Sequence, residues 1–241
     1  GSLREYLDLD VGGLIITPKP GIYEDVVAID FTSMFPSIIL RYNISYETCN
    51  LRGIKNVEKK AFLSKLIEEP YARRLFFKKL DSDDAKKRAK TLKLLLVASY
   101  GYAGKLDNRF GNMYCNFWIN KIAQEIMLRV IKLARKHGLE VIYADTDSVF
   151  VTKKENIESF ISEIKELFKI PVKIEHDFRK LVFINGVNNQ PVVKRYYGLT
   201  RKDDLVIKGL MAISVNTPLL IRNAQLEMIK CILEGNYKAL D

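Results

Sequence analysis

VIYADTDSVFV, residues 141–151, places two acids one residue apart between two runs of strand-forming hydrophobic residues. The hydrophobic runs predict two short strands joined by a tight turn from Ala144 to Asp147. Two carboxylates this close repel each other by about 1 kcal/mol in water at ~4 Å, and by more in a drier site. A bound divalent cation is the simplest compensation for that repulsion. The competing interpretation is a solvated hairpin turn, which we favour if this pair of acids is considered alone.

A third acid stands near the end of another predicted strand. The segment DVVAIDF, residues 25–31, predicts a buried strand that carries Asp30, and the glycine- and proline-rich residues 10–24 predict an extended lead-in and a turn. Residues 33–42 have hydrophobic side chains at helical spacing, so Asp30 lies where a strand passes into a helix. Backbone N–H groups at such a helix start are a favourable seat for phosphate oxygens.

Asp30, Asp145 and Asp147 are far apart in sequence but can meet on neighbouring strands of one sheet. A carboxylate cluster suits Mg²⁺, which takes oxygen ligands at ~2.1 Å and leaves positions open for phosphate. Two such ions ~4 Å apart activate a hydroxyl and stabilise the leaving oxygen during phosphoryl transfer. The three acids therefore predict metal-assisted phosphoryl transfer.

The rest of the chain predicts a mixed α+β protein. A charged helical region at 58–100, broken at Pro70 and at 81–87, is typical of an antiparallel helix pair with a solvated turn. After it we expect helices at about 112–137 and 155–168, strands at 171–178, 180–184, 191–199 and 204–210, and a helix at 217–238. In that last helix, the side chains expected to pack are Leu219, Leu220, Leu226, Ile229, Ile232 and Leu233.

The composition is that of a folded protein with a basic surface. The chain has 241 residues and a formal charge of +10, from 39 Lys and Arg against 29 Asp and Glu, which suits a polyanionic partner such as nucleic acid. Three cysteines without paired spacing and two histidines disfavour a zinc site or a disulfide framework. No apolar run approaches the ~20 residues of a membrane span. We therefore expect a cytoplasmic protein with no membrane partner.

Five segments together resemble the family B DNA polymerases. DFTSMFPSIIL at 30–40 is similar to their first polymerase motif, and YADTDS at 143–148 is similar to their third. KLLLVASYG at 93–101 resembles the second motif, and VKRYYG at 193–198 resembles their lysine-arginine-tyrosine segment. The segment that leads into the first motif, GGLIITPKPGIYEDVVAIDF at 12–31, also resembles the corresponding segment of the family. The motifs occur in the family's order, and the resemblance points to a divergent archaeal-type member.

The resemblance implies an α+β polymerase palm, an antiparallel sheet backed by helices, with a two-helix fingers insertion. The implied domains are a first palm part at 1–50, fingers helices at 51–100, a second palm part at 101–216, and the start of a thumb or a terminal helix at 217–241. It also implies that an exonuclease domain and most of the thumb are absent. The expected partners are primer-template DNA and deoxynucleoside triphosphates, with the remaining polymerase domains or replication accessory proteins, on DNA inside the cell.

The resemblance also assigns roles to individual residues. It implies two Mg²⁺ ions, with Asp30 and Asp147 as ligands, Glu175 as an accessory carboxylate, and Asp145 as a nearby catalytic acid. An exposed strand acid is the competing interpretation of Glu175. The implied nucleotide-binding residues are Ser33, Met34, Phe35, Arg74, Lys78, Lys93 and Tyr100, with Arg73 as an alternative to Arg74. The implied DNA-binding residues are Gly101, Lys194, Arg195 and Tyr196.

Two departures from the family pattern affect the expected activity. Val97 and Ala98 replace the asparagine and serine of the second motif, so two polar side chains near the nucleotide are gone. Each lost hydrogen bond is worth about 1 kcal/mol, which weakens nucleotide binding without abolishing metal chemistry. Phe35 replaces the tyrosine that excludes ribose; it keeps the ring, so discrimination should largely survive.

Three functions remain open at this point. The leading hypothesis is template-directed deoxynucleotidyl transfer by two-metal phosphoryl transfer. The second is a catalytically weak or inactive polymerase-like module that binds DNA or a replication partner. The third is another metal-dependent nucleotide enzyme, such as a cyclase, which would leave the finger cations without a purpose.

Overall fold

A computed structural model describes residues 12–236 apart from 106, 154, 187 and 189. The chain divides into two compact units, and each is described by itself. The sheet unit comprises Leu14–Phe31 and Arg129–Asp241, and the helical unit comprises Gly1–Gly13 and Thr32–Leu128. Helix α5, Met113–Lys136, begins in the helical unit and ends in the sheet unit.

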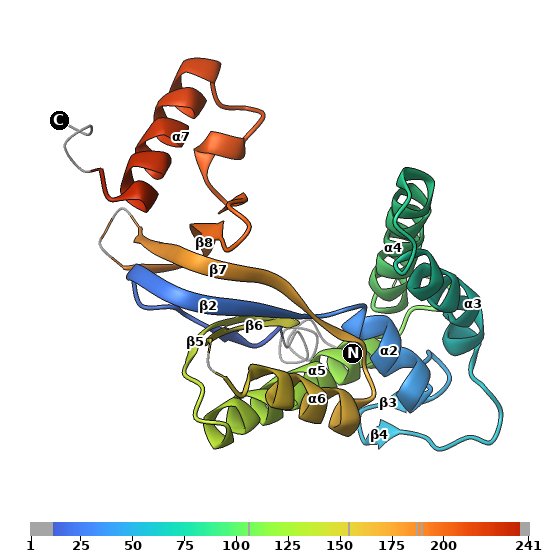
Figure 1. Cartoon of the computed structure of the whole chain (residues 1–241). Helices are drawn as coiled ribbons and strands as arrows, with labels where there is room; N and C mark the ends of the chain where they lie inside the picture. Colours follow the sequence, from blue (N-terminus) through green and yellow to red (C-terminus); the bar gives the residue numbers. More distant parts are fainter. Residues whose placement is uncertain (1–11, 106, 154, 187, 189, 237–241) are drawn as a thin grey trace. The chain divides into compact units, whose positions relative to one another are not determined.

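The sheet unit contains one antiparallel sheet in the order β1-β5-β6-β2-β7-β8-β9. Its strands are β1 Ile15–Ile16, β2 Gly21–Phe31, β5 Val141–Asp145, β6 Ser148–Thr152, β7 Val172–Asn185, β8 Pro191–Thr200 and β9 Leu205–Lys208. The long strands β2 and β7 run side by side (Figure 1). The predicted strand-turn-strand at 141–151 is confirmed as β5 and β6.

The sheet curls around an aromatic core. The Tyr143 ring of β5 lies 6.3 Å from the Tyr196 ring of β8, although three strands separate β5 from β8 in the sheet. Phe150 and Phe183 lie between them, with ring centroids 5.1 and 5.3 Å from that of Tyr143. Burial of these large rings stabilises the curled sheet.

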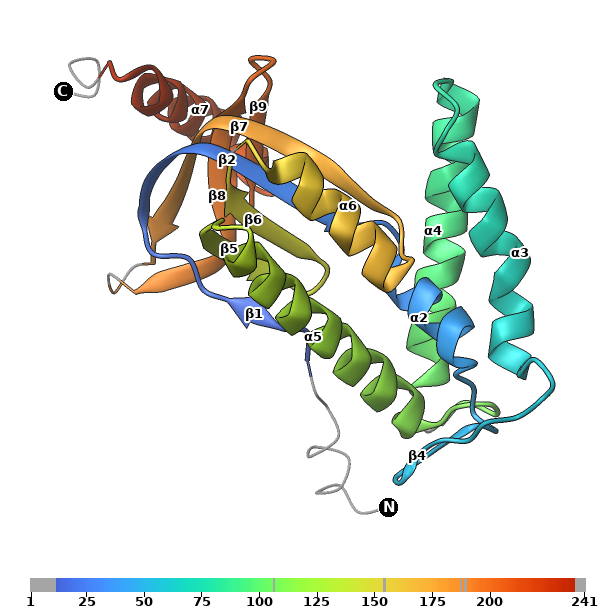
Figure 2. The ribbon, with the colours of Figure 1, turned by 60° about the horizontal axis from the view of Figure 1, so that its bottom comes forward.

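Helix α6, Ile157–Phe168, lies along one face of the sheet (Figure 2). Its apolar stripe of Ile157, Phe160, Ile161, Ile164 and Phe168 is buried. The Phe168 ring contacts Phe31 at 6.4 Å, which ties this helix to the end of β2. Helix α6 therefore backs the strand that carries Asp30.

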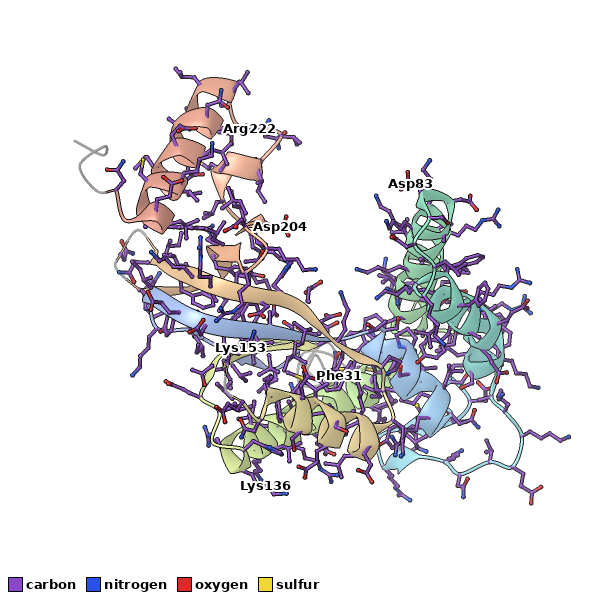
Figure 3. All side chains as sticks on the ribbon, in the orientation of Figure 1. Phe31, Asp83, Lys136, Lys153, Asp204 and Arg222 are labelled. Carbon is purple, nitrogen blue, oxygen red and sulfur yellow. The ribbon has the colours of Figure 1, made fainter. Side chains whose placement is uncertain are left out.

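In the helical unit, α3 and α4 form the predicted antiparallel pair. Helix α3 spans Phe62–Phe77 and α4 spans Asp83–Ala103, with Asp83 at the turn between them (Figure 3). The Ser82 hydroxyl caps α4 by accepting the Ala85 N–H at 3.2 Å. The other elements of this unit are α2 Met34–Tyr42, β3 Cys49–Asn50 and β4 Gly53–Ile54.

Three predicted boundaries are wrong. Pro70 does not break α3, because this helix packs along α4 and tolerates the missing backbone N–H of proline. Strand β2 begins at Gly21, since residues 21–24, predicted as lead-in and turn, already pair with β7. The predicted strands at 171–178 and 180–184 are the single strand β7, because no turn residue separates them.

The last described elements are the 3₁₀ turn Met211–Ile213 and helix α7, Leu219–Glu234. This helix packs on the sheet through a second apolar cluster. Leu226, Ile229, Ile232 and Leu233 belong to this cluster, as predicted. The expected packing of Leu219 and Leu220 is wrong, because their side chains are 67% and 81% exposed. The last residues of the predicted 217–238 helix lie outside the described part of the chain.

The predicted α+β fold class is confirmed, with a curled antiparallel sheet and accompanying helices. Within the described residues, no helix combines the length and the apolar character that crossing a membrane requires.

Candidate active site

Ser148 of β6 is the common strand partner of two acids in the sheet unit. It pairs with Asp30 of β2 on one side and with Asp145 of β5 on the other. Directly opposed residues of antiparallel strands have their side chains on the same face of the sheet. The Asp30 and Asp145 carboxylates therefore share one face, across three adjacent strands.

Asp147 occupies the turn between β5 and β6. Its carbonyl accepts the Phe31 N–H at 2.9 Å, and its own N–H donates to the Asp145 carbonyl at 2.6 Å. Thr146 has a left-handed backbone with φ 55°, and its N–H donates to the Leu14 carbonyl at 2.9 Å. These bonds fix the turn, so Asp147 is held next to the end of β2, where Asp30 lies.

Glu175 lies at an irregularity of β7. Ala28 pairs with His176 and Ile29 with Ile174, so Glu175 is the extra residue of a β-bulge. Bulges of this kind redirect a side chain next to a site. Glu175 is exposed and its carboxylate lies 3.6 Å from the Lys173 ammonium group, while Lys173 pairs across the strands with Asp30.

The donor chemistry of these acids fits a hard divalent cation, because carboxylate oxygens are the ligands that Mg²⁺ prefers. Asp30 and Asp145 come from the ends of β2 and β5, and Asp147 comes from the turn after β5. Among the residues that the structure describes, no group of three or more Asp, Glu, His or Cys side chains is already gathered as a metal site.

Lys194 lies beside the acids. Its ammonium group is 3.4 Å from the Asp145 carboxylate, and its backbone N–H donates to the Tyr143 hydroxyl at 3.1 Å. The backbone of Lys194 is left-handed, with φ 62°, within an irregular stretch of β8. Burial raises the pKa of Tyr143 and the Asp145 charge raises it further, so this hydroxyl stays protonated.

The other two residues of this segment have different environments. Arg195 is exposed, whereas Tyr196 is buried in the aromatic core. Burial, with smaller contributions from the charges of Glu175 and Asp145, raises the pKa of Tyr196 to about 12. The Tyr196 ring therefore stabilises the sheet, and both acids lie close enough to affect its hydroxyl.

In the helical unit, the start of α2 exposes backbone donors. Ser33 precedes the helix with a left-handed backbone of φ 59°, and its buried hydroxyl has no hydrogen-bond partner among the described residues. The first N–H groups of a helix have no intrahelical acceptor. The Met34 side chain is buried, so only its backbone is available to a ligand.

The Phe35 ring contacts the Tyr100 ring, with 4.8 Å between their centroids, and the Tyr100 hydroxyl donates to the Asn120 side chain at 3.1 Å.

The predicted finger cations line one cavity of about 400 Å³, which we call the basic cleft. Arg74, Lys78 and Lys93 all contribute to it, and the Lys78 ammonium group lies 3.4 Å from the Thr32 hydroxyl. Arg74 is only 8% exposed. Arg73 instead pairs with Glu69 at 2.6 Å on the solvent side of the helix. The geometry therefore favours Arg74 over Arg73.

Three further cations that were not predicted from the sequence line the basic cleft: Lys79, Lys86 and Lys90. Lys86, Lys90 and Lys93 are spaced by four and three residues, which places them on one helical face. That spacing could have identified these lysines from the sequence.

The remaining predicted residue of the helical unit, Gly101, is exposed near the end of α4.

Comparisons with known proteins agree on one family. A model of DNA polymerase family B matches residues 8–96. The chain is 29% identical over 228 residues to DNA polymerase 2 of Saccharolobus solfataricus, covering 92% of this chain and 35% of that protein. It is 29% identical over 253 residues to the DNA polymerase of Archaeoglobus fulgidus, covering 95% of this chain and 32% of that protein.

A solved structure has a similar fold. It is the family B DNA polymerase from the hyperthermophilic archaeon Pyrobaculum calidifontis, with a TM-score of 0.65 and 25% sequence identity. The match covers 95% of this chain and 34% of that one. This chain thus spans about a third of the length of such relatives.

Proposed function

Because the chain is a relative of the family B DNA polymerases, we propose that it forms the palm and fingers portion of a template-directed DNA polymerase. The reaction is the addition of deoxynucleotides to a primer 3′ end. The observation that carries the proposal is the register of Ser148, which brings Asp30 and Asp145 onto one face of the sheet beside the turn of Asp147. The implied domain limits at residues 50, 100 and 216 are part of this proposal.

The acids of the sheet unit are assigned to the metal. Asp30 and Asp147 would hold two Mg²⁺ ions, with Glu175 as an accessory carboxylate. When bound, Mg²⁺ lowers the pKa of a hydroxyl nucleophile and offsets charge on phosphoryl oxygens. Asp145 acts as a neighbouring acid whose charge is partly balanced by Lys194, 3.4 Å away.

The helical unit is assigned to the nucleotide. Arg74, Lys78 and Lys93 of the basic cleft would offset the negative charge on the triphosphate. The N–H groups of residues 33–35 would donate to phosphate oxygens. Phe35 would pack under the sugar and Tyr100 against the base, consistent with the contact between their rings.

Four residues are assigned to primer-template DNA: Gly101, Lys194, Arg195 and Tyr196. Lys194 and Arg195 are exposed and would contact phosphate, which holds DNA without reading its sequence. Gly101 permits close approach of the DNA, and the buried Tyr196 would act mainly by holding the lysine-arginine segment. Other polymerase domains or replication accessory proteins would complete the assembly.

Primer extension tests this proposal. Asp30→Asn and Asp147→Asn keep the side-chain volume and remove the charge, and each should lower extension at least ~100-fold. Asp84→Asn, at an exposed position on the first turn of α4, is the matched control and should extend normally. Equal extension by wild type, Asp30→Asn and Asp147→Asn would refute the assignment.

A second function is favoured by one observation. Val97 and Ala98 stand where the family has asparagine and serine, so this part of α4 offers fewer polar groups to a nucleotide. A catalytically weak or inactive module that binds DNA or a partner would have this property. Micromolar binding of primer-template without detectable incorporation would favour this alternative.

A further inference from the structure

The helical unit contains an apolar pocket that is separate from the basic cleft. It has a volume of about 380 Å³ and lies between the start of α3 and the end of α4. Tyr46, Phe62 and Phe110 form an aromatic cluster in its wall, with ring centroids 5.0 to 6.0 Å apart. Phe62 and Tyr46 are partly exposed, so the pocket presents ring surface to solvent.

The pocket is lined mainly by apolar and aromatic side chains, of which Tyr46 and Tyr102 carry hydroxyls, and its two serine hydroxyls are already bonded within the chain. The Ser45 hydroxyl is bonded to Glu47, and the Ser99 hydroxyl donates to the Leu95 carbonyl at 2.9 Å. Ala98, which replaces the serine of the family's second motif, contributes only a methyl group. A ligand would therefore be held by stacking and apolar contact rather than by its hydrogen-bonding edge.

Cations flank the pocket on the loop after α4. The Arg109 guanidinium lies 5.4 Å from the centre of the Phe110 ring, and both Arg109 and Lys105 are exposed. The Asn108 side chain donates to the Tyr102 carbonyl at 2.9 Å, which holds this loop against α4. A Cβ atom at Gly111 would lie 1.6 Å from the Lys105 carbonyl oxygen, so the close packing of the loop requires glycine there. Arg109 is thus held near the aromatic wall, and Lys105 lies on the same loop.

We propose that this pocket accepts an unpaired nucleobase of single-stranded template DNA, with Arg109 and Lys105 contacting the adjoining phosphates. Aromatic walls with a basic rim are the features by which proteins bind single strands without sequence preference, since every base has a π face. Stacking and apolar contacts with the aromatic wall do not depend on which base is bound, as a template site requires. This inference rests on the proposed polymerase function and adds a subsite to it.

The test uses the whole chain and a single-stranded oligonucleotide carrying one 2-aminopurine, whose fluorescence is quenched when it stacks on a ring. Phe110→Ala should weaken binding roughly tenfold or more, and Phe110→Leu, which keeps most of the apolar volume, should weaken it similarly. Phe76→Ala removes an exposed ring elsewhere on α3 and should bind like wild type. Arg109→Ala should lower the slope of log affinity against log salt by about one.

Three results would overturn the inference. The first is unchanged quenching in Phe110→Leu with an intact circular dichroism spectrum, and the second is a loss of oligonucleotide binding in Phe76→Ala equal to that in Phe110→Ala. The third is failure of the oligonucleotide to displace anilinonaphthalene sulfonate from the pocket. The last result would assign the pocket to another occupant, such as an apolar side chain of a protein partner. The same binding assay on Asp147→Asn separates this inference from the proposed function. That variant should lose extension and keep full quenching, so each hypothesis can fail without the other.

Discussion

Lys194 and Asp145 form an ion pair across the curled sheet, with 3.4 Å between the ammonium and carboxylate groups. Strands β8 and β5, which carry them, are separated by three other strands, so only the curl of the sheet brings the two side chains together. The side chain of Lys194 is 56% exposed and that of Asp145 is 19% exposed. An exposed ammonium group paired with a more buried acid can offset its charge and still reach a phosphate.

Lys194→Ala should weaken primer-template binding about fivefold, which corresponds to about 1 kcal/mol for a partly exposed charge contact. The slope of log affinity against log salt should fall by about one, because one phosphate contact is lost. Fluorescence anisotropy at several salt concentrations measures both. Lys202→Ala, at an exposed position in the turn after β8, is the control and should leave both quantities nearly unchanged. A normal salt slope in Lys194→Ala would exclude the phosphate contact.

Lys93→Ala should lower kcat for nucleotide incorporation by about 10²-fold, because a cation that stabilises charge developing in the transition state is removed. Lys93 lines the basic cleft with Arg74 and Lys78. Lys87 is exposed on the same helix and outside the lining of that cleft, so Lys87→Ala is the control. Single-turnover incorporation at saturating nucleotide separates kcat from binding. Equal losses in the two variants would indicate a general effect of charge on α4.

Gly209→Ala should destabilise the sheet unit by about 1–3 kcal/mol, because the new Cβ has two costs. Gly209 has a left-handed backbone with φ +66°, and a Cβ would lie 2.3 Å from the Lys194 carbonyl oxygen. Gly235 is also left-handed, with φ +75°, but a Cβ there would meet nothing within 4 Å. Gly235→Ala therefore measures the backbone strain alone. Thermal denaturation should show a larger loss for Gly209→Ala; equal losses would mean that Lys194 moves aside freely.

Hydrophobic patterns in the sequence predicted most of the helices and strands, and many of the side chains that they bury. The helix predicted at about 112–137 is confirmed as α5, and hydrophobic residues at helical spacing within it are buried: Ile119, Ile122, Ile126, Val130 and Leu133. A short apolar run likewise placed Asp30 near the end of a buried strand. Such patterns depend only on near neighbours in the chain, so sequence alone is enough to recognise them.

Curvature and local backbone geometry could not be predicted in this way. The sequence does not show that the Tyr196 ring is buried, because the burial arises where the sheet curls far enough to bring β8 against Tyr143 of β5. The left-handed backbone of Lys194 and the bulge at Glu175 depend on pairing between distant strands. Period-2 alternation gives the face of a residue but neither the curl of a sheet nor the position of a bulge.

His176 should make the sheet unit less stable at mildly acidic pH. Burial is the main cause that lowers the pKa of His176. The charges of Lys173 and Lys208 lower this pKa further, and the charges of Glu175 and Asp204 partly offset the shift. Its ring lies 5.3 Å from that of Phe178 in β7. Because the unfolded chain binds this proton more readily, the free energy of unfolding should fall as the pH drops from about 6.5 toward the lowered pKa.

His176→Asn removes the titration and keeps a polar side chain of moderate size, so its free energy of unfolding should vary less with pH between 8 and 5. Urea denaturation of both proteins across that range measures the difference. At pH 8, where the imidazole is neutral in both states, the two proteins should differ only by the lost packing of the ring against Phe178. If the two curves stay parallel from pH 8 to 5, protonation of His176 does not contribute to the loss of stability in acid.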